Sequence, residues 1–430
     1  MITLPRPIGI IGGRRIPFCR INTGYAELGN SDMLAAAFKG LVDAYGLKGE
    51  TIGDVAAGAT VKHARDWSLA REAVLGSGLN PRTPAHNLDR ACGTSLSTVI
   101  ELGARIAIGE LDSAIAGGVD SASDIPVTYS RHFRRILLDL KRARTLGERL
   151  KVLARWRPSD LKPHILGFAE AQTHLSMGEH CELMAKEWQL TRKDQDEFAY
   201  HSQVKAAAAW KSGFYSDLVV PFHGVDHDNT VRPDTSLEAL ARLRPAFDKT
   251  GTGTLTAGNS TPLSDGASAV LLASEDWAKA HGFEIQAYLT HFAVDAVDFA
   301  GLSSPYHEGL LMAPTYAVPR MLDAAGLQLQ DFDFYEIHEA FAAQVICTLH
   351  AWESPEYCRV HLGRKEPLGA IDSSKLNVKG GSVALGHPFA ATGGRIVAGL
   401  AKLLAARGGG RGLVSICTGG GMGVTAILER

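Results

Sequence analysis

The segment GTSLSTVIELGARIAIGELDSAIAGG (residues 93–118) decides the fold, because the chain contains a second segment of the same design. Apolar residues at helical spacing are followed by a short apolar run that ends in glycines, which predicts a helix leading into a buried strand. The segment FAATGGRIVAGLAKLLAARGGGRGLVSICTGGG (389–421) has the same order. The sequence therefore predicts a layered α/β architecture in which one unit occurs twice.

A second pair of segments is repeated in the same way. LAAAFKGLVDAYGLKGETIGDVAAG (34–58) and TYAVPRMLDAAGLQLQDFDFYEIHEA (315–340) each contain an amphipathic stretch, a Gly-Leu pair that ends it and an apolar run. Both pairs predict two α/β halves, residues 1–120 with 250–275 and residues 276–430. A general alternation of helices and strands would leave a similar pattern, so the repeats alone do not establish a duplication.

Residues 121–249 differ in composition from both halves and are predicted to form a helical domain inserted in the first half. EHCELMAKEWQLTRKDQDEFAYHSQVKAAAAWKSGF (179–214) predicts two helices, with Thr191 as the N-cap of the second. The stretch 131–157 is rich in Arg and Lys, and its apolar residues recur at helical spacings. These apolar residues are Ile136, Leu137, Leu140, Leu146, Leu150 and Leu153.

The composition of the chain excludes several classes of protein. Its 430 residues, 45% hydrophobic and 21% charged, suffice for two or three core-forming units, and a net charge of -2 gives no global attraction to nucleic acid. The six cysteines lack the spacing of a zinc site or a disulfide scaffold, which favours reduced thiols in a cytoplasmic protein. The N-terminus lacks the features of a signal or transit peptide, and no apolar stretch is expected to reach the roughly 20 residues that span a bilayer.

Cys92, in LDRACGTSLSTV (88–99), is the first candidate for chemistry. Only a thiolate is a strong nucleophile, and a predicted helix N-terminus directly after this cysteine would lower its pKa. Small neighbours would let a substrate carbonyl approach and would present a backbone N–H to it. The alternative is a buried cysteine that packs as a small apolar residue.

Three further residues share this setting beside glycines at the end of a predicted strand or helix. His387, in GHPFAATGG, could take a proton from a thiol, His338 ends the predicted strand FDFYEI, and Cys417 precedes glycines whose N–H groups could form an oxyanion hole. Each residue also has a structural explanation, as a turn-capping histidine, a strand-end histidine or a core cysteine. A phosphate-binding loop is a poor explanation for these glycines, because neither GxxxxGK[ST] nor a strand-anchored GxGxxG fits.

These motifs together resemble the thiolase family over essentially the whole chain. RACGTS resembles its nucleophile motif, GHPFAATG its histidine motif, CTGGGMG its second-cysteine motif and GTLTAGNSTPLSDGASAV (253–270) its segment that contacts coenzyme A. The resemblance implies a duplicated α/β/α/β/α layered fold with a helical loop domain in the first half. HEAF (338–341) and the basic stretch are similar to the β-subunit of the fatty-acid oxidation trifunctional complex and its bacterial counterparts.

The resemblance also implies a role for each candidate residue. Cys92 would accept the acyl group, His387 would activate it and help to hold the thioester oxygen, and Cys417 would move the proton at the substrate α-carbon. The N–H groups of Gly419 and Cys92 would form an oxyanion hole, and His338 would replace the asparagine of NEAF in many biosynthetic thiolases. Four further positions match residues that line the pantetheine channel or contact CoA. They are Met177 and Phe341, and Ala257 and Thr261.

The implied activity is cleavage of 3-ketoacyl-CoA by CoA, and condensation of two acetyl-CoA molecules is the alternative within the family. A decarboxylative ketoacyl synthase is disfavoured, because such enzymes usually lack the second cysteine. A non-catalytic acyl-CoA or lipid-binding protein is disfavoured because every reactive position is present. No metal or prosthetic group is expected, since the substrate is itself a thioester.

The same resemblance implies a homodimer or tetramer, and the net charge of -2 predicts no nucleic-acid partner. The basic stretch 131–157 has several explanations at this level. It could be a solvated helical face, lie on an anionic membrane surface, dock a hydratase/dehydrogenase subunit, or attract the phosphates of CoA.

Overall fold

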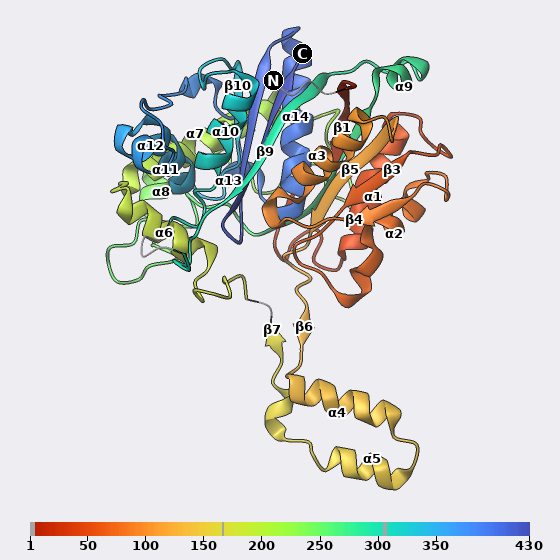
Figure 1. Cartoon of the computed structure of the whole chain (residues 1–430). Helices are drawn as coiled ribbons and strands as arrows, with labels where there is room; N and C mark the ends of the chain where they lie inside the picture. Colours follow the sequence, from red (N-terminus) through yellow and green to blue (C-terminus); the bar gives the residue numbers. More distant parts are fainter. Residues whose placement is uncertain (1–4, 166, 304–307) are drawn as a thin grey trace.

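A computed structural model describes residues 5–165, 167–303 and 308–430, and its centre is a ten-stranded sheet (Figure 1). The strand order is β10-β11-β12-β9-β1-β8-β5-β3-β4, and β2 (Cys19–Arg20) pairs with β8 beside this path. The strands of the path are β1 (Ile8–Arg15), β3 (Asp54–Ala57), β4 (Ala85–Asn87), β5 (Ser113–Asp120), β8 (Ser264–Ala273), β9 (Ala287–Ala296), β10 (Phe334–Ile337), β11 (Arg411–Thr418) and β12 (Met422–Glu429).

The sheet confirms the predicted duplication. In the first half β1 is antiparallel to β8, β8 is antiparallel to β5, and β5 is parallel to β3. In the second half β9, β12, β11 and β10 follow one another with the same directions. An antiparallel pairing of β1 with β9, from Ile8↔Leu289 to Ile10↔Ala287, joins the two halves.

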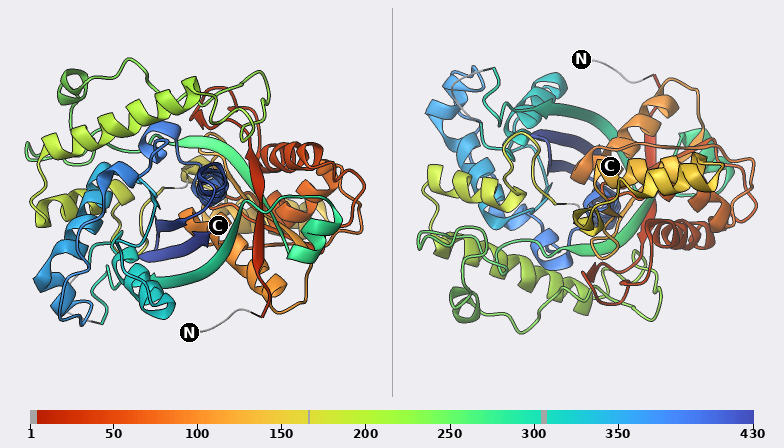
Figure 2. Two further views of the ribbon diagram at one scale, coloured as in Figure 1. Left: turned by 90° about the horizontal axis from the view of Figure 1, so that it is seen from above. Right: turned by 90° about the horizontal axis from the view of Figure 1, so that it is seen from below.

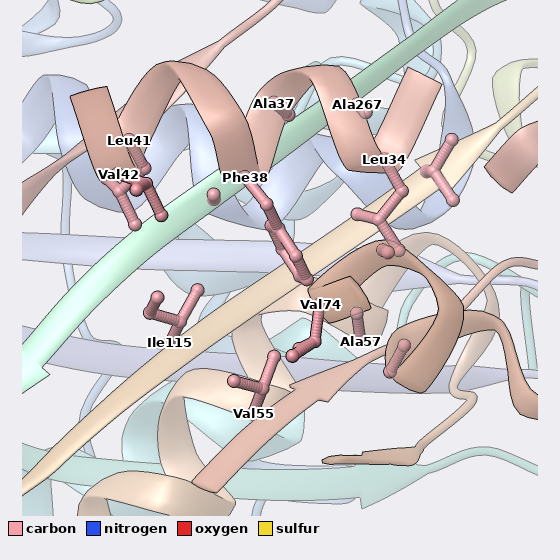
Figure 3. Packing of buried hydrophobic residues seen from close by; sticks show 14 of the residues in the cluster. Leu34, Ala37, Phe38, Leu41, Val42, Val55, Ala57, Val74, Ile115 and Ala267 are labelled. Carbon is pink, nitrogen blue, oxygen red and sulfur yellow. The ribbon is translucent and has the colours of Figure 1, made fainter. Parts of the chain in front are cut away.

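Helices complete five layers. The helices α3 (Thr94–Ala107) and α14 (Thr392–Arg407) lie between the strands of the two halves and share one apolar core with both (Figure 2). The helices α1 (Asn30–Ala44) and α2 (Leu69–Ser77) cover the outer face of the first half, where Phe38 packs onto the sheet (Figure 3). The helices α10 (Pro314–Ala325) and α11 (Ala342–Glu353) cover the outer face of the second half. The α/β/α/β/α expectation is thus confirmed.

The central helix α14 corrects the expectation that no apolar stretch is long enough to span a bilayer. Residues 389–407 form a helix that is long and apolar enough to cross a membrane, but 72% of its most apolar 18-residue stretch is buried inside the protein. This burial explains the apolar composition, because α14 is covered by protein on most sides. Gly393 permits the close contact with α3, since a Cβ there would lie 2.5 Å from the backbone nitrogen of Leu96.

The segment between β5 and β8 contains the predicted helices. They are α4 (Arg131–Arg142), α5 (Leu146–Leu153), α6 (Met177–Glu187), α7 (Arg192–Lys211) and α8 (Leu237–Ala241). The Thr191 hydroxyl accepts a hydrogen bond from the backbone of Asp194, which confirms it as the N-cap of α7.

The helices α4 and α5 form a hairpin that stands away from the body on a two-stranded ribbon of β6 (Val127–Thr128) and β7 (His164–Ile165) (Figure 1). Short helices complete the structure: α9 (Glu275–Ala280), α12 (Pro355–Val360) and α13 (Ser382–Leu385).

Candidate active site

The four predicted reactive residues come together where the two halves meet. Cys92 lies in a 3₁₀ turn (Ala91–Gly93) at the start of α3, and His387 lies between α13 and the turn that starts α14. His338 directly follows β10, and Cys417 is near the end of β11. The equivalent positions of the repeated units therefore supply one cluster.

His387 is in contact with both Cys92 and His338, and Cys417 lies near Cys92. Nε2 of His387 lies 3.2 Å from Sγ of Cys92, which is hydrogen-bonding distance for sulfur. The imidazole rings of His338 and His387 have centroids 4.1 Å apart. Cys417 is close enough to Cys92 for the charge of one thiolate to raise the pKa of the other.

The backbone around Cys92 is held in an uncommon conformation. Ala91 has a φ of +44°, a left-handed conformation that costs a non-glycine residue free energy. Two hydrogen bonds stabilise the turn, from the Arg90 amide to the hydroxyl of Thr94 and from the Ala91 amide to the carboxylate of Asp89. The turn thus holds the Cys92 thiol against His387.

The prediction that the helix N-terminus gives Cys92 a lowered pKa is wrong, because the net shift of this pKa is upward. Burial raises the pKa of the thiol to about 12, although the N–H groups of Gly419 and of Cys92 itself act in the opposite direction. Burial also lowers the pKa of His387 to about 3, with the charge of Arg395 as a smaller cause. Burial therefore favours the neutral form of both groups, the thiol of Cys92 and the imidazole of His387, before substrate binds.

Neighbouring residues fix the orientation of His387. Its Nδ1 lies 2.6 Å from the hydroxyl of Thr392, and its backbone N–H donates to the hydroxyl of Ser264. The carboxylate of Asp120 accepts a hydrogen bond from the amide of Ala390, which anchors the turn after His387. This turn lies directly on β5, where a Cβ at Gly118 would come within 2.0 Å of the Ala390 carbonyl oxygen.

The glycines after Cys417 form a loop beside the nucleophile. Burial raises the pKa of Cys417 well above the ordinary value, so it too is a neutral thiol in the free protein. The N–H of Gly419 is directed at the Cys92 sulfur and acts to lower the pKa of that thiol. The next amide, that of Gly420, donates to Oε1 of Glu170 at 2.7 Å, which connects the inserted domain to this loop.

Of the four predicted CoA-contacting residues, three lie beside the reactive cluster and one does not. Met177 starts α6 with its sulfur close to Gly419, and Phe341 lies in the same apolar cluster as Cys417, edge-on to Phe247. The hydroxyl of Thr261 donates to the carbonyl of Ser382. Ala257 is exposed on the loop before β8, outside this hydrogen-bonded cluster.

Sequence reasoning missed several residues that contact the reactive cluster, among them Thr392, Ser382 and Glu170. Thr392 is inside the quoted motif GHPFAATG, five residues after His387, and its contact with Nδ1 could have been anticipated from that spacing. Ser382 contacts Nδ1 of His338 from a segment 44 residues away, and Glu170 reaches Gly420 across 250 residues. No local pattern indicates either of these two contacts.

Comparisons with known proteins agree with this geometry. Residues 8–276 match the family model "Thiolase, N-terminal domain" and residues 286–430 match "Thiolase, C-terminal domain". Proteins named 3-ketoacyl-CoA thiolase from Shewanella sp. (strain W3-18-1) and Yersinia pestis (strain Pestoides F) are 40% and 41% identical over 428 residues, which cover 98% of this chain and 96% of each relative.

Two solved structures are similar over essentially the whole chain. Human mitochondrial 3-ketoacyl-CoA thiolase in complex with CoA has a TM-score of 0.81 and 28% identity, with 100% of this chain and 99% of that chain covered. The acetyl-CoA acetyltransferase of Bacillus anthracis has a TM-score of 0.81 and 26% identity, with 100% of both chains covered. The duplicated fold, the motifs and the two family models together show that this chain belongs to the thiolase family.

Proposed function

We propose that this protein cleaves 3-ketoacyl-CoA with CoA, giving acetyl-CoA and a shortened acyl-CoA. The observation that carries the proposal is the 3.2 Å contact between Nε2 of His387 and Sγ of Cys92, with the second thiol of Cys417 beside it. A nucleophile, its base and a separate proton donor are the groups that breaking a carbon–carbon bond next to a carbonyl requires. The names of the relatives at 40–41% identity support the same activity.

In the first half-reaction His387 takes the proton of Cys92 as the sulfur attacks the 3-keto carbon. The bond between C2 and C3 then breaks, the acyl group stays on Cys92, and the departing C2 takes a proton from Cys417. Because both thiols are neutral in the free protein, each proton transfer is coupled to a bond that forms or breaks at the substrate. Acetyl-CoA leaves, and Cys417 is a thiolate.

In the second half-reaction Cys417 takes the proton of a CoA thiol, which attacks the acyl-Cys92 thioester. The bond to Cys92 breaks, and its thiolate recovers the proton from His387. Negative charge develops on the thioester oxygen, and we assign its stabilisation to the N–H groups of Cys92 and Gly419, which act on the Cys92 sulfur in the free protein.

The test compares thiolysis of acetoacetyl-CoA with that of a medium- or long-chain 3-ketoacyl-CoA, for the wild type and Cys92→Ser. We expect turnover of the longer substrate, an acyl mass on the Cys92 peptide, and nearly no turnover by Cys92→Ser with an unchanged melting temperature. Turnover close to wild type in that variant would overturn the assignment of the nucleophile. Activity restricted to acetyl-CoA and acetoacetyl-CoA would instead indicate condensation.

We further propose that the α4–α5 hairpin binds an anionic membrane surface. Residues 131–157 contain ten Lys or Arg residues and two acidic residues. The predicted apolar face is not packed against the body, since Leu146 is 74% exposed and Leu150 is 59% exposed, and of the six apolar residues only Ile136 is buried. Exposed leucines among basic residues are typical of helices that lie in a lipid interface.

Sedimentation with vesicles tests this proposal. We expect binding to vesicles that contain phosphatidylserine and not to pure phosphatidylcholine, with less binding at high salt and for the double variant Leu146→Ser/Leu150→Ser. Leu75→Ser, at a 55% exposed leucine on α2, is the matched control. Absence of binding at low salt would refute the membrane proposal, and co-purification of a hydratase/dehydrogenase subunit through the same hairpin would replace it.

We propose that the protein is a homodimer or tetramer. The strand β4 ends the sheet, and no described strand pairs with its outer edge. Trp67, 80% exposed, follows β3 in the same half. Light scattering of the purified protein tests the proposal, and a monomer at micromolar concentration would contradict it.

We also propose a cytoplasmic location and a reaction without metal or prosthetic group. The free state of all six cysteines supports a reducing compartment, and the thioester substrate supplies the activated acyl group. Cell fractionation tests the location. Full activity after dialysis against a chelator is the expected result for the chemistry.

A further inference from the structure

A buried chain of hydrogen bonds ends at His338. Nη2 of Arg395 donates to Oγ of Ser382 at 2.9 Å, and the same oxygen lies 2.9 Å from Nδ1 of His338. Ser382 and His338 are completely buried and Arg395 is nearly so, so water does not compete for these contacts. Nε2 of His338 has no hydrogen-bond partner among the described residues, although it is buried.

The chemistry of arginine sets the direction of the chain. A guanidinium group has only donors, so Ser382 must accept from Arg395. The Ser382 hydroxyl hydrogen then has one described neighbour able to accept it, Nδ1 of His338. If Nδ1 carried a hydrogen and donated to Ser382 instead, this hydroxyl hydrogen would be buried without an acceptor, which is costly. The favoured tautomer of His338 therefore has its hydrogen on Nε2.

His387 is placed differently. The Thr392 hydroxyl beside its Nδ1 receives no hydrogen bond from an obligate donor among the described residues, so it can either donate or accept. His387 can therefore hold a proton on either nitrogen, as an acceptor of the Cys92 proton must. His338, 4.1 Å away, is held in one state.

We propose that Ser382, oriented by Arg395, is a positioning residue that holds His338 as the Nε2–H tautomer, so that His338 donates a hydrogen bond to the acyl oxygen of the substrate and does not compete with His387 as the base. The substrate oxygen in this statement rests on the proposed thiolase activity. The tautomer rests only on the geometry of Arg395, Ser382 and His338.

The tautomer is measured directly by NMR with histidine labelled with ¹⁵N in the ring. The His338 signals are those lost in His338→Asn, and they are expected to show hydrogen on Nε2 and none on Nδ1 in the wild type. In Ser382→Ala we expect a mixture of both tautomers. Hydrogen on Nδ1 in the wild type, or an unchanged tautomer in Ser382→Ala, would overturn the proposal. The wild-type spectrum keeps the test decisive even if the variant does not fold.

Kinetics separate positioning from a merely structural role. Ser382→Ala is expected to lower kcat for thiolysis about 10- to 100-fold with KM changed less than about threefold, below the 10²- to 10³-fold loss typical for removal of a whole oxyanion donor. In the His338→Asn background the same substitution is expected to change kcat by less than about twofold, because an asparagine has no tautomer to hold. Equal losses in both backgrounds would overturn the proposal.

Ser77→Ala is the matched control, because Ser77 is also a buried serine and its hydroxyl donates to a backbone carbonyl in α2, away from the site. It is expected to keep the wild-type kcat. If the wild type shows the Nε2–H tautomer without any thiolysis, the proposed function fails and the tautomer inference stands. If thiolysis is present and the tautomer is Nδ1–H, the inference fails alone.

Discussion

Replacement of Thr392 by valine tests how His387 works as a base. The Thr392 hydroxyl is completely buried and lies 2.6 Å from Nδ1 of His387. When His387 takes the Cys92 proton it becomes an imidazolium ion, and its Nδ1–H must then donate to Thr392. A hydrogen bond to a charged group contributes about 1.5–3 kcal/mol, which corresponds to about 10- to 150-fold in rate. Valine keeps the shape of the side chain and removes this acceptor, so acylation is expected to slow by that factor.

The assay is a single turnover of acetoacetyl-CoA with excess enzyme, in which formation of acylated Cys92 is followed by quenching and mass spectrometry. Thr348→Val is the matched control, because the hydroxyl of Thr348 is buried and donates to the backbone carbonyl of Gln344 inside α11. This control is expected to acylate at the wild-type rate. An acylation rate for Thr392→Val within twofold of wild type, at an unchanged melting temperature, would refute the role given to Thr392.

Three further outcomes are expected. Cys417→Ala should lose exchange of the acetyl-CoA α-protons with D₂O, measured by NMR, because Cys417 is the proton donor to C2; retained exchange would assign Cys417 to packing. Alkylation of Cys92 by iodoacetamide in the free protein should rise about tenfold per pH unit from pH 7 to pH 10, because burial raises the pKa of the thiol to about 12 and only the thiolate reacts. A plateau below pH 9, seen by peptide mass spectrometry, would contradict a neutral resting pair. Gly118→Ala should lower the free energy of unfolding by about 1–3 kcal/mol and reduce turnover, because the added Cβ would lie 2.0 Å from the Ala390 carbonyl oxygen and displace the turn after His387. Denaturation and steady-state rates equal to wild type would show that the turn adapts.

The duplication could be predicted from the sequence because each repeated unit is local. A helix, a glycine stop and a strand lie within about 25 to 30 consecutive residues, and apolar periodicity reports on each of them. The catalytic motifs could be found for the same reason, since Cys92 and His387 precede the helix of such a unit and Cys417 is near the end of its strand. Because the topology is repeated, the ends of these units meet in one place.

Contacts between distant segments could not be predicted in this way. The leucines of residues 131–157 have helical spacing, but spacing does not show whether a partner element covers them, and the structure leaves most of them exposed. The apolar run of α14 is the opposite case, because strands of both halves cover it and most of it is buried. Ser382 and Glu170 reach their partners across 44 and 250 residues, where no periodicity applies.

The error in the direction of the Cys92 pKa has the same origin. A helix N-terminus is visible in the sequence, but its partial charge contributes only about 0.3–1 kcal/mol at an exposed site, less than one pKa unit. Removal of the thiolate from water raises the pKa. The size of this increase depends on the protein around the sulfur, which includes His387, Cys417 and the Gly419 loop. Burial therefore exceeds the helix contribution, and Cys92 rests as a thiol. A nucleophile of this kind depends on a base that can receive its proton during the attack, which is His387, and the tautomer proposed for His338 keeps that second histidine from competing for the proton.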